Sequence, residues 1–327
     1  MAGQPTRRCV DMAPGEDIGP IVDHRRVGWG EKAHSRAGTF AAMLVSERIG
    51  QFFLESEDGR DRLEYTEYGA GDAWVVLLHG QLMPRRMQQP LARALAAEGL
   101  HVITLDLLGH GRSDRPADPF AYSVTAFAEQ VIALLDHLGA PQAVVGGTSL
   151  GANVALEVAT LAPRRVRGLI VEMPVLDNAL EAGLIAFAPL LFAARFLPVT
   201  VTGLRMLTRP VPRGIVPFWA GIVLDTLDQR PAPMAAVVHG MFFGRIAPPS
   251  RERRAITVPA LVVGHGADPV HPAADAAMLA EEMPHATFVK ATSILEWRLR
   301  PQRLDRLAAG FAQACWRSPR RARRTGA

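Results

Sequence analysis

The chain has 327 residues, of which 49% are hydrophobic and 21% are charged, as is ordinary for a globular protein. Its formal net charge of +4 comes from the tail 317–327, which holds five arginines and no acidic residue, so the chain without this tail carries −1 (+4 minus 5). The basicity therefore indicates a disordered, solvated end and excludes a nucleic-acid surface as its cause.

The cysteines and the apolar runs limit the class of protein further. Cys9 and Cys315 stand near opposite ends, a spacing that suggests neither a disulfide framework nor a metal site and fits a cytoplasmic location. The start of the chain lacks the order of a secretory signal. The longest apolar run, 182–194, contains Pro189 and is shorter than the roughly 18 residues of a spanning helix, so no transmembrane segment is expected.

Strand and helix patterns alternate along the chain after a first segment, 1–42, that has no sustained hydrophobic period and is predicted to be a flexible extension. Strand patterns lie at 62–69, 74–80, 101–107, 143–147, 166–173, 260–266 and 286–291. Helix patterns lie at 85–98, 123–138, 150–161, 273–283 and 301–316. Short apolar strands that alternate with helices predict an α/β fold, a mostly parallel sheet with helices on both faces.

The segment 174–257 interrupts this alternation. It contains ten prolines and no convincing buried strand, and its stretch 179–204 carries only Glu181 and Arg195 as charged residues. We interpret it as a helical cap inserted between the two parts of one sheet domain, residues 43–173 and residues 258–316. Such an insertion is expected over the carboxyl ends of the strands, where α/β sheets bind ligands.

The stretch "GGTSLGANVAL", 146–156, has the spacing of a nucleophile elbow. Gly147, Ser149 and Gly151 stand between a strand pattern and a helix pattern. In such an elbow the serine occupies a strained turn, the small neighbours avoid clashes, and the helix N-terminus favours developing negative charge. The plainer interpretation is a tight turn with a helix-capping serine. The context favours the nucleophile.

A second stretch, "LLHGQL" at 77–82, ends a strand with His-Gly. The loop that follows can present the Gln81 backbone N–H to an oxyanion, and the N–H of Leu150 would supply the second donor.

Together with "DLLGHGRSD" at 106–114, these stretches resemble the α/β-hydrolase fold family, in its capped serine-hydrolase type. The resemblance covers about 60–173 and 258–316 and implies a hydrolase activity at Ser149. It also implies that His79 and His110 are structural.

The acid of the family follows the penultimate strand as Gly-x-x-Asp. Within "VGHGADPVHP", 263–272, the loop that corresponds to this pattern carries Asp268, here two residues after Gly266, although an aspartate before proline is also an ordinary turn former. The family's histidine follows the last strand, and the corresponding positions here are Ser293 or Ile294. No histidine occurs after residue 285. A serine hydroxyl without a base is a weak nucleophile, so another residue must supply one.

His271, on the loop of the predicted acid, is the best candidate for a relocated base, with Glu172 as an orienting acid; it could equally be a plain loop residue. His239 in the insertion is a weaker candidate. His265 is expected to be an ordinary loop residue, and His285 is expected to cap the turn before the last strand.

Three functional interpretations remain open. The first is a cytoplasmic serine hydrolase that acts on a small to medium apolar ester through an acyl-enzyme at Ser149. The second is a catalytically silent ligand-binding protein in which Glu296 and Trp297 fill the space of the missing histidine. The third is another reaction of this fold, such as cofactor-free oxygenation or C–C cleavage; epoxide and haloalkane chemistry is disfavoured, because it uses an aspartate at the elbow. No dinucleotide, phosphate-loop or metal motif is present, so no cofactor and no metal are expected.

Overall fold

The computed structural model describes residues 45–56, 59–268 and 270–317. The predicted extension 1–42 and nearly all of the predicted basic tail lie outside these ranges.

The described chain forms one eight-stranded sheet in the order β1-β2-β4-β3-β5-β6-β7-β8. β1 and β2 pair antiparallel, as do β2 and β4, and the other neighbours are parallel. The predicted fold class is therefore confirmed. The strands are β1 (Glu47–Ser56), β2 (Gly59–Tyr68), β3 (Trp74–Leu78), β4 (His101–Leu105), β5 (Ala143–Thr148), β6 (Val166–Glu172), β7 (Ala260–His265) and β8 (Ala286–Ala291).

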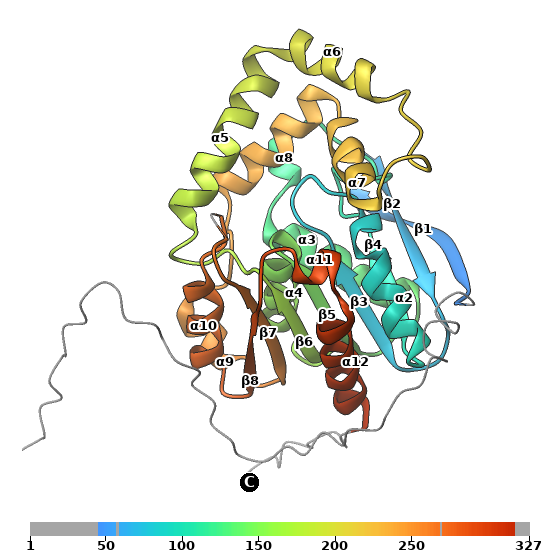
Figure 1. Ribbon diagram of the computed structural model, residues 1–327, viewed down its shortest axis with the longest axis vertical. Helices are drawn as coiled ribbons and strands as arrows, with labels where there is room; N and C mark the ends of the chain where they lie inside the picture. The colour runs from blue at the N-terminus through green and yellow to red at the C-terminus, as the bar shows by residue number, and fades with distance from the viewer. Residues whose placement is uncertain (1–44, 57–58, 269, 318–327) are drawn as a thin grey trace, which may run out of the picture. The chain divides into compact units, whose positions relative to one another are not determined.

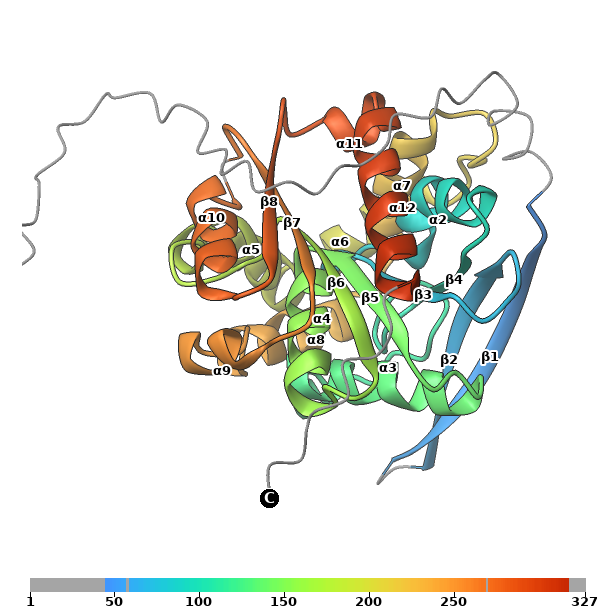
Figure 2. The ribbon, with the colours of Figure 1, turned by 90° about the horizontal axis from the view of Figure 1, so that it is seen from below.

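Helices cover both faces of the sheet, as Figure 2 shows. Because successive side chains of a strand point to opposite faces, Val144 packs into one core and Val145 into the other. The core that contains Val145 includes residues of α3 (Val124–His137), α4 (Leu150–Leu161) and α10 (Ala273–Glu282). The other core includes residues of α2 (Gln89–Ala97) and α12 (Gln302–Arg317).

Two elements differ from the sequence patterns. The sequence patterns predicted no strand at the position of the edge strand β1. Its sequence, "ERIGQFFLES", mixes charged residues with glycine, and of its two adjacent phenylalanines Phe52 is buried and Phe53 is exposed. The helix expected at 85–98 begins as a 3₁₀ turn, η2 (Arg85–Gln88), and becomes α-helical only from Gln89, where Pro90 occupies the first turn. Two short elements complete the chain, η3 (Pro119–Ala121) and α11 (Glu296–Leu299).

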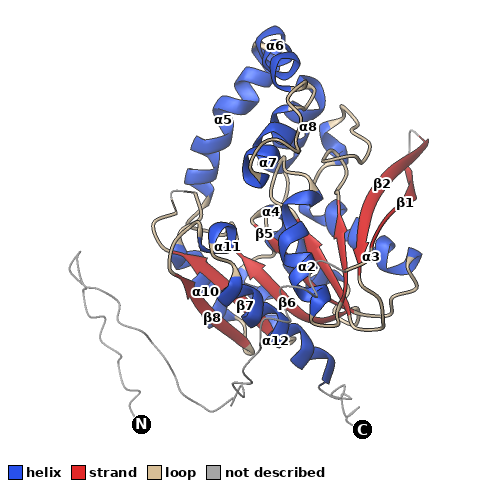
Figure 3. Ribbon diagram, turned by 45° about the vertical axis from the view of Figure 1, so that its right-hand side comes forward, coloured by secondary structure: helices blue, strands red, loops and turns tan. Residues whose placement is uncertain are grey.

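The interval 174–257 contains helices and no strand. Its helices are α5 (Leu180–Phe196), α6 (Pro198–Thr208), α7 (Phe218–Leu227), α8 (Pro231–Phe243) and α9 (Ser250–Ala255). Figures 1 and 3 show α5 to α8 beyond the carboxyl ends of the strands, whereas α9 returns to contact α4 and α10.

Two buried side chains attach this helical segment to the sheet domain. Asn153, in α4, donates to the carbonyls of Val175 (2.8 Å) and Ile246 (2.9 Å), which lie near the two ends of the segment. Asp275, in α10, accepts from the N–H groups of Leu176 (2.9 Å) and Asn178 (3.1 Å). The entry and exit of the segment are thereby held beside the helix that follows Ser149.

Within the described ranges, no single helix is long and apolar enough to cross a membrane. One bent pair, Ile185–Phe196 with Pro198–Thr208, reaches that length and composition only when its parts are taken together.

We predict that Gly151→Ala destabilises the protein by about 1–3 kcal/mol, because its new methyl group would lie 2.5 Å from the Leu78 carbonyl oxygen. Gly203→Ala, in α6, is the matched control: no atom lies within 4 Å of the added methyl group, so a gain of up to about 1 kcal/mol is expected. Urea unfolding of both variants measures this, and equal effects would contradict it.

Candidate active site

Ser149 occupies the sharp turn between β5 and α4. Its φ of +55° and ψ of −113° lie where L-residues are rarely found, and its N–H donates to the Glu172 carbonyl at 2.9 Å. A Cβ on Gly147 would lie 2.6 Å from the Gly151 carbonyl carbon, so neither elbow glycine has room for a side chain. The turn therefore has the strand–turn–helix geometry of a nucleophile elbow.

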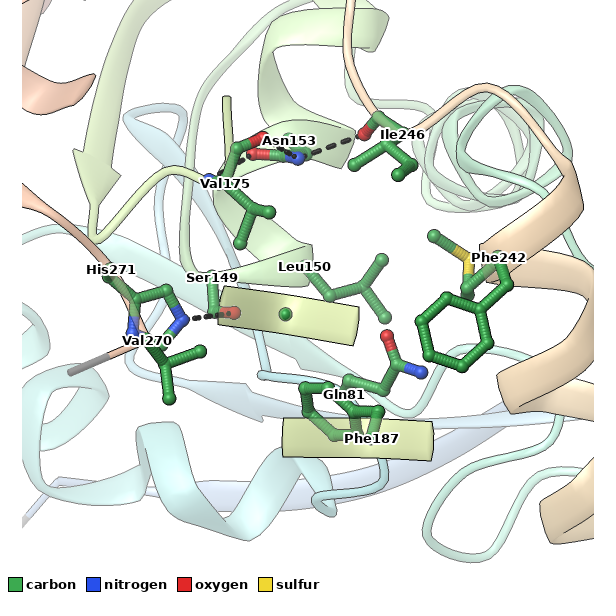
Figure 4. Close-up of a pocket in the computed structure, with 12 residues that line it drawn as sticks. Gln81, Ser149, Leu150, Asn153, Val175, Phe187, Phe242, Ile246, Val270 and His271 are labelled. Atoms are coloured by element: carbon green, nitrogen blue, oxygen red, sulfur yellow. Dashed lines mark hydrogen bonds between the residues drawn. The ribbon is translucent and has the colours of Figure 1, made fainter. Parts of the chain in front are cut away.

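Asp268 and His271 lie on the loop after β7, and this loop brings them to the elbow. Asp268 Oδ1 accepts from the N–H groups of Val270 (2.8 Å) and His271 (2.9 Å), which fixes the loop around the carboxylate. Asp268 Oδ2 lies 3.1 Å from His271 Nδ1, and His271 Nε2 lies 2.9 Å from Ser149 Oγ. Figure 4 shows the His271 ring directed at the serine hydroxyl. The structure thus joins the predicted nucleophile, base and acid in one hydrogen-bonded chain.

The environment keeps Asp268 ionised. Burial opposes its charge, but the hydrogen bonds from the His271 ring, the His271 N–H and the Val270 N–H outweigh burial and hold its pKa at about 2. An anionic Asp268 accepts from His271 Nδ1–H. In the neutral tautomer that carries its proton on Nδ1, His271 donates to Asp268 and presents Nε2 as the acceptor for the Ser149 proton.

The loop after β3 and the first residue of α4 each place a further group at the site. Gly80 to Met83 form a turn closed by a hydrogen bond of 3.1 Å, and Leu82 at its third position has a φ of +61°. Gln229, in the segment between α7 and α8, donates to the Leu82 carbonyl and ties the turn to the helical segment. Among the described residues, neither the Gln81 N–H nor the Leu150 N–H donates to a protein acceptor. Both residues line the same pocket as Ser149.

His79 and His110 are buried beneath this loop, with ring centroids 4.6 Å apart. Burial lowers the pKa of both imidazoles, so they are neutral. His79 Nε2 accepts from the Leu107 N–H at 3.1 Å, and its Nδ1–H donates to the Gly80 carbonyl at 2.9 Å. His79 therefore supports the loop and does not reach the serine.

A pocket of about 580 Å³, its open mouth included, lies above Ser149. Twelve residues line it, and none of the twelve is Asp, Glu, Lys or Arg. Figure 4 shows most of them. They are Gln81, Ser149, Leu150, Asn153, Val175, Gly183, Phe187, Met241, Phe242, Ile246, Val270 and His271.

The segment where the family's histidine was expected serves another purpose. The Ser293 carbonyl accepts from His265 Nδ1 at 2.9 Å. Glu296 accepts from Thr292 and Arg303, while Trp297 is buried in the α2/α12 core and donates from Nε1 to Asp305 at 2.8 Å. Neither Glu296 nor Trp297 lines the pocket, so the expectation that they fill the histidine's space is wrong.

Glu172 is likewise occupied elsewhere, which corrects its suggested role beside His271. Its carboxylate accepts from Thr148 Oγ (2.5 Å), from His265 Nε2 (3.1 Å) and from Arg298 Nη2 (2.9 Å). Burial raises the pKa of Glu172, but the charges and hydrogen bonds of Arg298 and His265 outweigh it and hold the pKa at about 2. This buried cluster connects the ends of β5, β6 and β7 to α11. Sequence patterns did not reveal it, because its members stand far apart along the chain.

The remaining candidate histidines do not line the pocket. His239 is exposed in α8, with its ring 4.7 Å from that of Phe243. His285 is also exposed, and its carbonyl accepts from the Ala260 N–H at 3.1 Å. In the described part of the chain, no group of three or more His, Cys, Asp or Glu side chains is placed to hold a metal ion.

The sequence of this chain matches a family model and the sequences of known proteins. A family model described as the alpha/beta hydrolase fold matches residues 73–197. A protein of Azorhizobium caulinodans that bears the name "Putative carbamate hydrolase RutD" is 32% identical over 236 residues that cover 70% of this chain and 85% of the relative. The chain therefore belongs to the α/β-hydrolase fold family, and we assign it to the hydrolases of that family.

Two further matches are narrower in what they show. The dihydrolipoyllysine-residue acetyltransferase component of an acetoin cleaving system from Pseudomonas putida is 40% identical over 119 residues, but these cover 35% of this chain and only 30% of that protein. The crystallised thermophilic esterase of Thermogutta terrifontis superposes with a TM-score of 0.64 at 21% identity, over 81% of this chain and 99% of its own. It shows the same fold.

The Glu172–His265 pair predicts a pH-dependent stability. Burial lowers the pKa of His265, but the hydrogen bond and charge of Glu172 outweigh it and raise the pKa above its ordinary 6.5. A raised pKa means that the stabilisation is complete below pH 6.5 and is lost as the pH rises through the folded-state pKa. The free energy of unfolding of the wild type, relative to His265→Gln, should therefore fall as the pH rises above 6.5.

Urea unfolding at several pH values measures this difference. The matched control is His285→Gln, which removes an exposed histidine. A wild-type advantage over His265→Gln that grows with rising pH would contradict the assignment.

Proposed function

We propose that this chain is a serine hydrolase that cleaves small to medium, uncharged apolar carboxylic esters through an acyl-enzyme at Ser149. One observation carries the proposal. The Ser149 hydroxyl lies 2.9 Å from His271 Nε2, and the other nitrogen of the same ring lies 3.1 Å from Asp268. Nucleophile, base and orienting acid meet the distances that proton transfer requires without any rearrangement.

In the acylation step, Ser149 Oγ attacks the ester carbonyl carbon while His271 Nε2 takes the hydroxyl proton. The carbonyl electrons move onto oxygen, and the free N–H groups of Gln81 and Leu150 donate to that oxyanion. When the tetrahedral intermediate collapses, the bond to the alkoxy group breaks and His271 returns the proton to the leaving alcohol. Asp268 stabilises the imidazolium that exists in between.

In the deacylation step, water attacks the acyl carbon and loses its proton to His271 Nε2. The bond to Ser149 Oγ breaks, His271 reprotonates the serine, and a carboxylic acid leaves. Each step conserves atoms and charge with these residues alone.

The pocket supports an uncharged apolar substrate. Phe187 and Phe242 contribute aromatic surface, Val175 and Ile246 contribute aliphatic surface, and the twelve lining residues include no Asp, Glu, Lys or Arg to pair with a charged group of the substrate.

The name of the Azorhizobium caulinodans relative supports carbonyl chemistry more broadly, because a carbamate, like an ester, is cleaved at a carbonyl carbon. The silent ligand-binding interpretation is less well supported, since it gives no reason for a base within hydrogen-bonding distance of the serine. We further propose that the catalytic chain acts in the cytoplasm on a small-molecule substrate without a cofactor.

We predict that Ser149→Ala and His271→Ala each lower kcat/KM for p-nitrophenyl butyrate by about 10⁴-fold or more, and that Asp268→Asn lowers it by about 10⁴-fold. His239→Ala is the matched control, because it removes an exposed histidine of the helical segment. Circular dichroism checks that each variant is folded. Retention of more than a tenth of the activity in folded His271→Ala would reject the assigned base.

A second prediction concerns substrate charge. The neutral ester p-nitrophenyl hexanoate should be cleaved with a kcat/KM at least about tenfold above that of the p-nitrophenyl monoester of adipic acid, whose free carboxylate would be buried without a partner. Equal values, or a preference for the anionic ester, would show that the pocket does not select by polarity. The same pair tested on Ser149→Ala corrects for background hydrolysis.

A further inference from the structure

The helices α5 and α6 expose an unusual amount of apolar surface. We call residues 185–209 the cap tip. Its large apolar side chains include eight that are between 46% and 84% exposed: Ile185, Phe192, Phe196, Leu197, Val199, Leu204, Met206 and Leu207. Clustered apolar side chains in contact with water mark a surface that binds something.

The cap tip is arranged as a bent surface element. α5 and α6 meet at 100°, with Pro198 in the first turn of α6, and Figures 1 and 3 show α5 running away from the sheet to α6, which lies at the far end of the cap. Phe192 and Phe196 pair on the exposed side of α5, with ring centroids 5.0 Å apart. On another side of the same helix, Gly183 and Phe187 line the pocket above Ser149.

The charged residues within the interval that contains the cap tip are all cationic. Residues 182–224 contain four arginines and neither Asp nor Glu. Arg205 and Arg213 pair with Asp228 and Asp225, which follow this interval.

The other two arginines remain available. Arg195 and Arg209 are exposed, and neither forms an ion pair with any described residue. The Arg195 guanidinium lies 6.0 Å from the centroid of the Phe196 ring. A cation is thus placed directly beside the exposed aromatic pair.

We propose that the cap tip docks onto an anionic lipid bilayer, with its apolar side chains in the interface and Arg195 and Arg209 on the lipid headgroups. Exposed aliphatic and aromatic side chains flanked by arginines are the composition of helices that lie in a membrane interface. A twofold contact with a second copy fits less well, because it would place this cationic patch against itself with no carboxylate to neutralise it. The helices lie on the bilayer and do not span it.

This inference does not depend on the chemistry at Ser149. The binding experiment therefore uses Ser149→Ala as well as the wild type, and loss of the proposed hydrolase activity would leave its result unchanged. Docking would place α5, which lines the pocket above Ser149, on the lipid bilayer in which apolar esters dissolve.

The test is cosedimentation of the full chain with sucrose-loaded vesicles. One vesicle population is phosphatidylcholine alone, and the other contains 30% phosphatidylglycerol (about one lipid in three). The protein should bind the phosphatidylglycerol vesicles at least about tenfold more tightly, and high salt should reduce this preference. The double variant Arg195→Gln with Arg209→Gln should bind the phosphatidylglycerol vesicles more weakly, with a loss of about fivefold in affinity for each arginine replaced.

The apolar contribution is tested with matched pairs of variants. Phe192→Ser with Phe196→Ser should weaken binding to phosphatidylglycerol vesicles at least about tenfold. Ile49→Ser with Phe53→Ser is the control, because these side chains are 64% and 48% exposed on the edge strand β1 at the sheet's far side. It should bind as the wild type does.

Three results would overturn the proposal. The first is that the wild type binds neither vesicle population, and the second is that both double serine variants bind equally well. The third is that the wild type is a dimer by analytical ultracentrifugation and the Phe192/Phe196 variant is a monomer, which would assign the surface to a second copy of the chain.

Discussion

The close approach of Gly147 to Gly151 is the constraint on which the rest of the site depends. A side chain on Gly147 would collide with Gly151, and one on Gly151 would collide with the Leu78 carbonyl, so β5 can turn directly into α4 only with hydrogen atoms at both positions. In this turn Ser149 has a φ of +55°. The strain is held by the sheet around it, since the Ser149 N–H bonds to the end of β6. Everything else at the site, from the oxyanion turn to the pocket, is arranged around a hydroxyl that this contact places.

The proposed base, His271, and the proposed acid, Asp268, lie three residues apart on one loop. Asp268 shapes that loop by accepting two of its backbone N–H groups, and the same carboxylate orients the His271 ring. One anion thus organises both the backbone and the imidazole. Because the segment after β8 need not supply a base, it contributes instead to the Glu172 cluster through the Ser293 carbonyl and Arg298.

The sequence predicted most of the sheet and the elbow, because buried strands and glycine spacing are local signals. It missed β1, whose pattern is weak at the sheet edge. The sequence offered His271 as a candidate base but could not single it out, because the contact between His271 Nε2 and Ser149 Oγ joins residues 122 positions apart in the chain. It assigned Glu172 to the wrong histidine for the same reason: the long-range pairing of Glu172 with His265 and Arg298 depends on how strand ends meet in space.

The central claim is that His271 activates Ser149. The most direct measurement is the second-order rate of phosphonylation of Ser149 by a fluorophosphonate, followed by intact-protein mass spectrometry, in the wild type and in His271→Ala. The account predicts rapid labelling of the wild type at Ser149 and a rate lower by about 10³-fold or more in the variant. Equal labelling rates in the two proteins, or no labelling of the wild type, would contradict it.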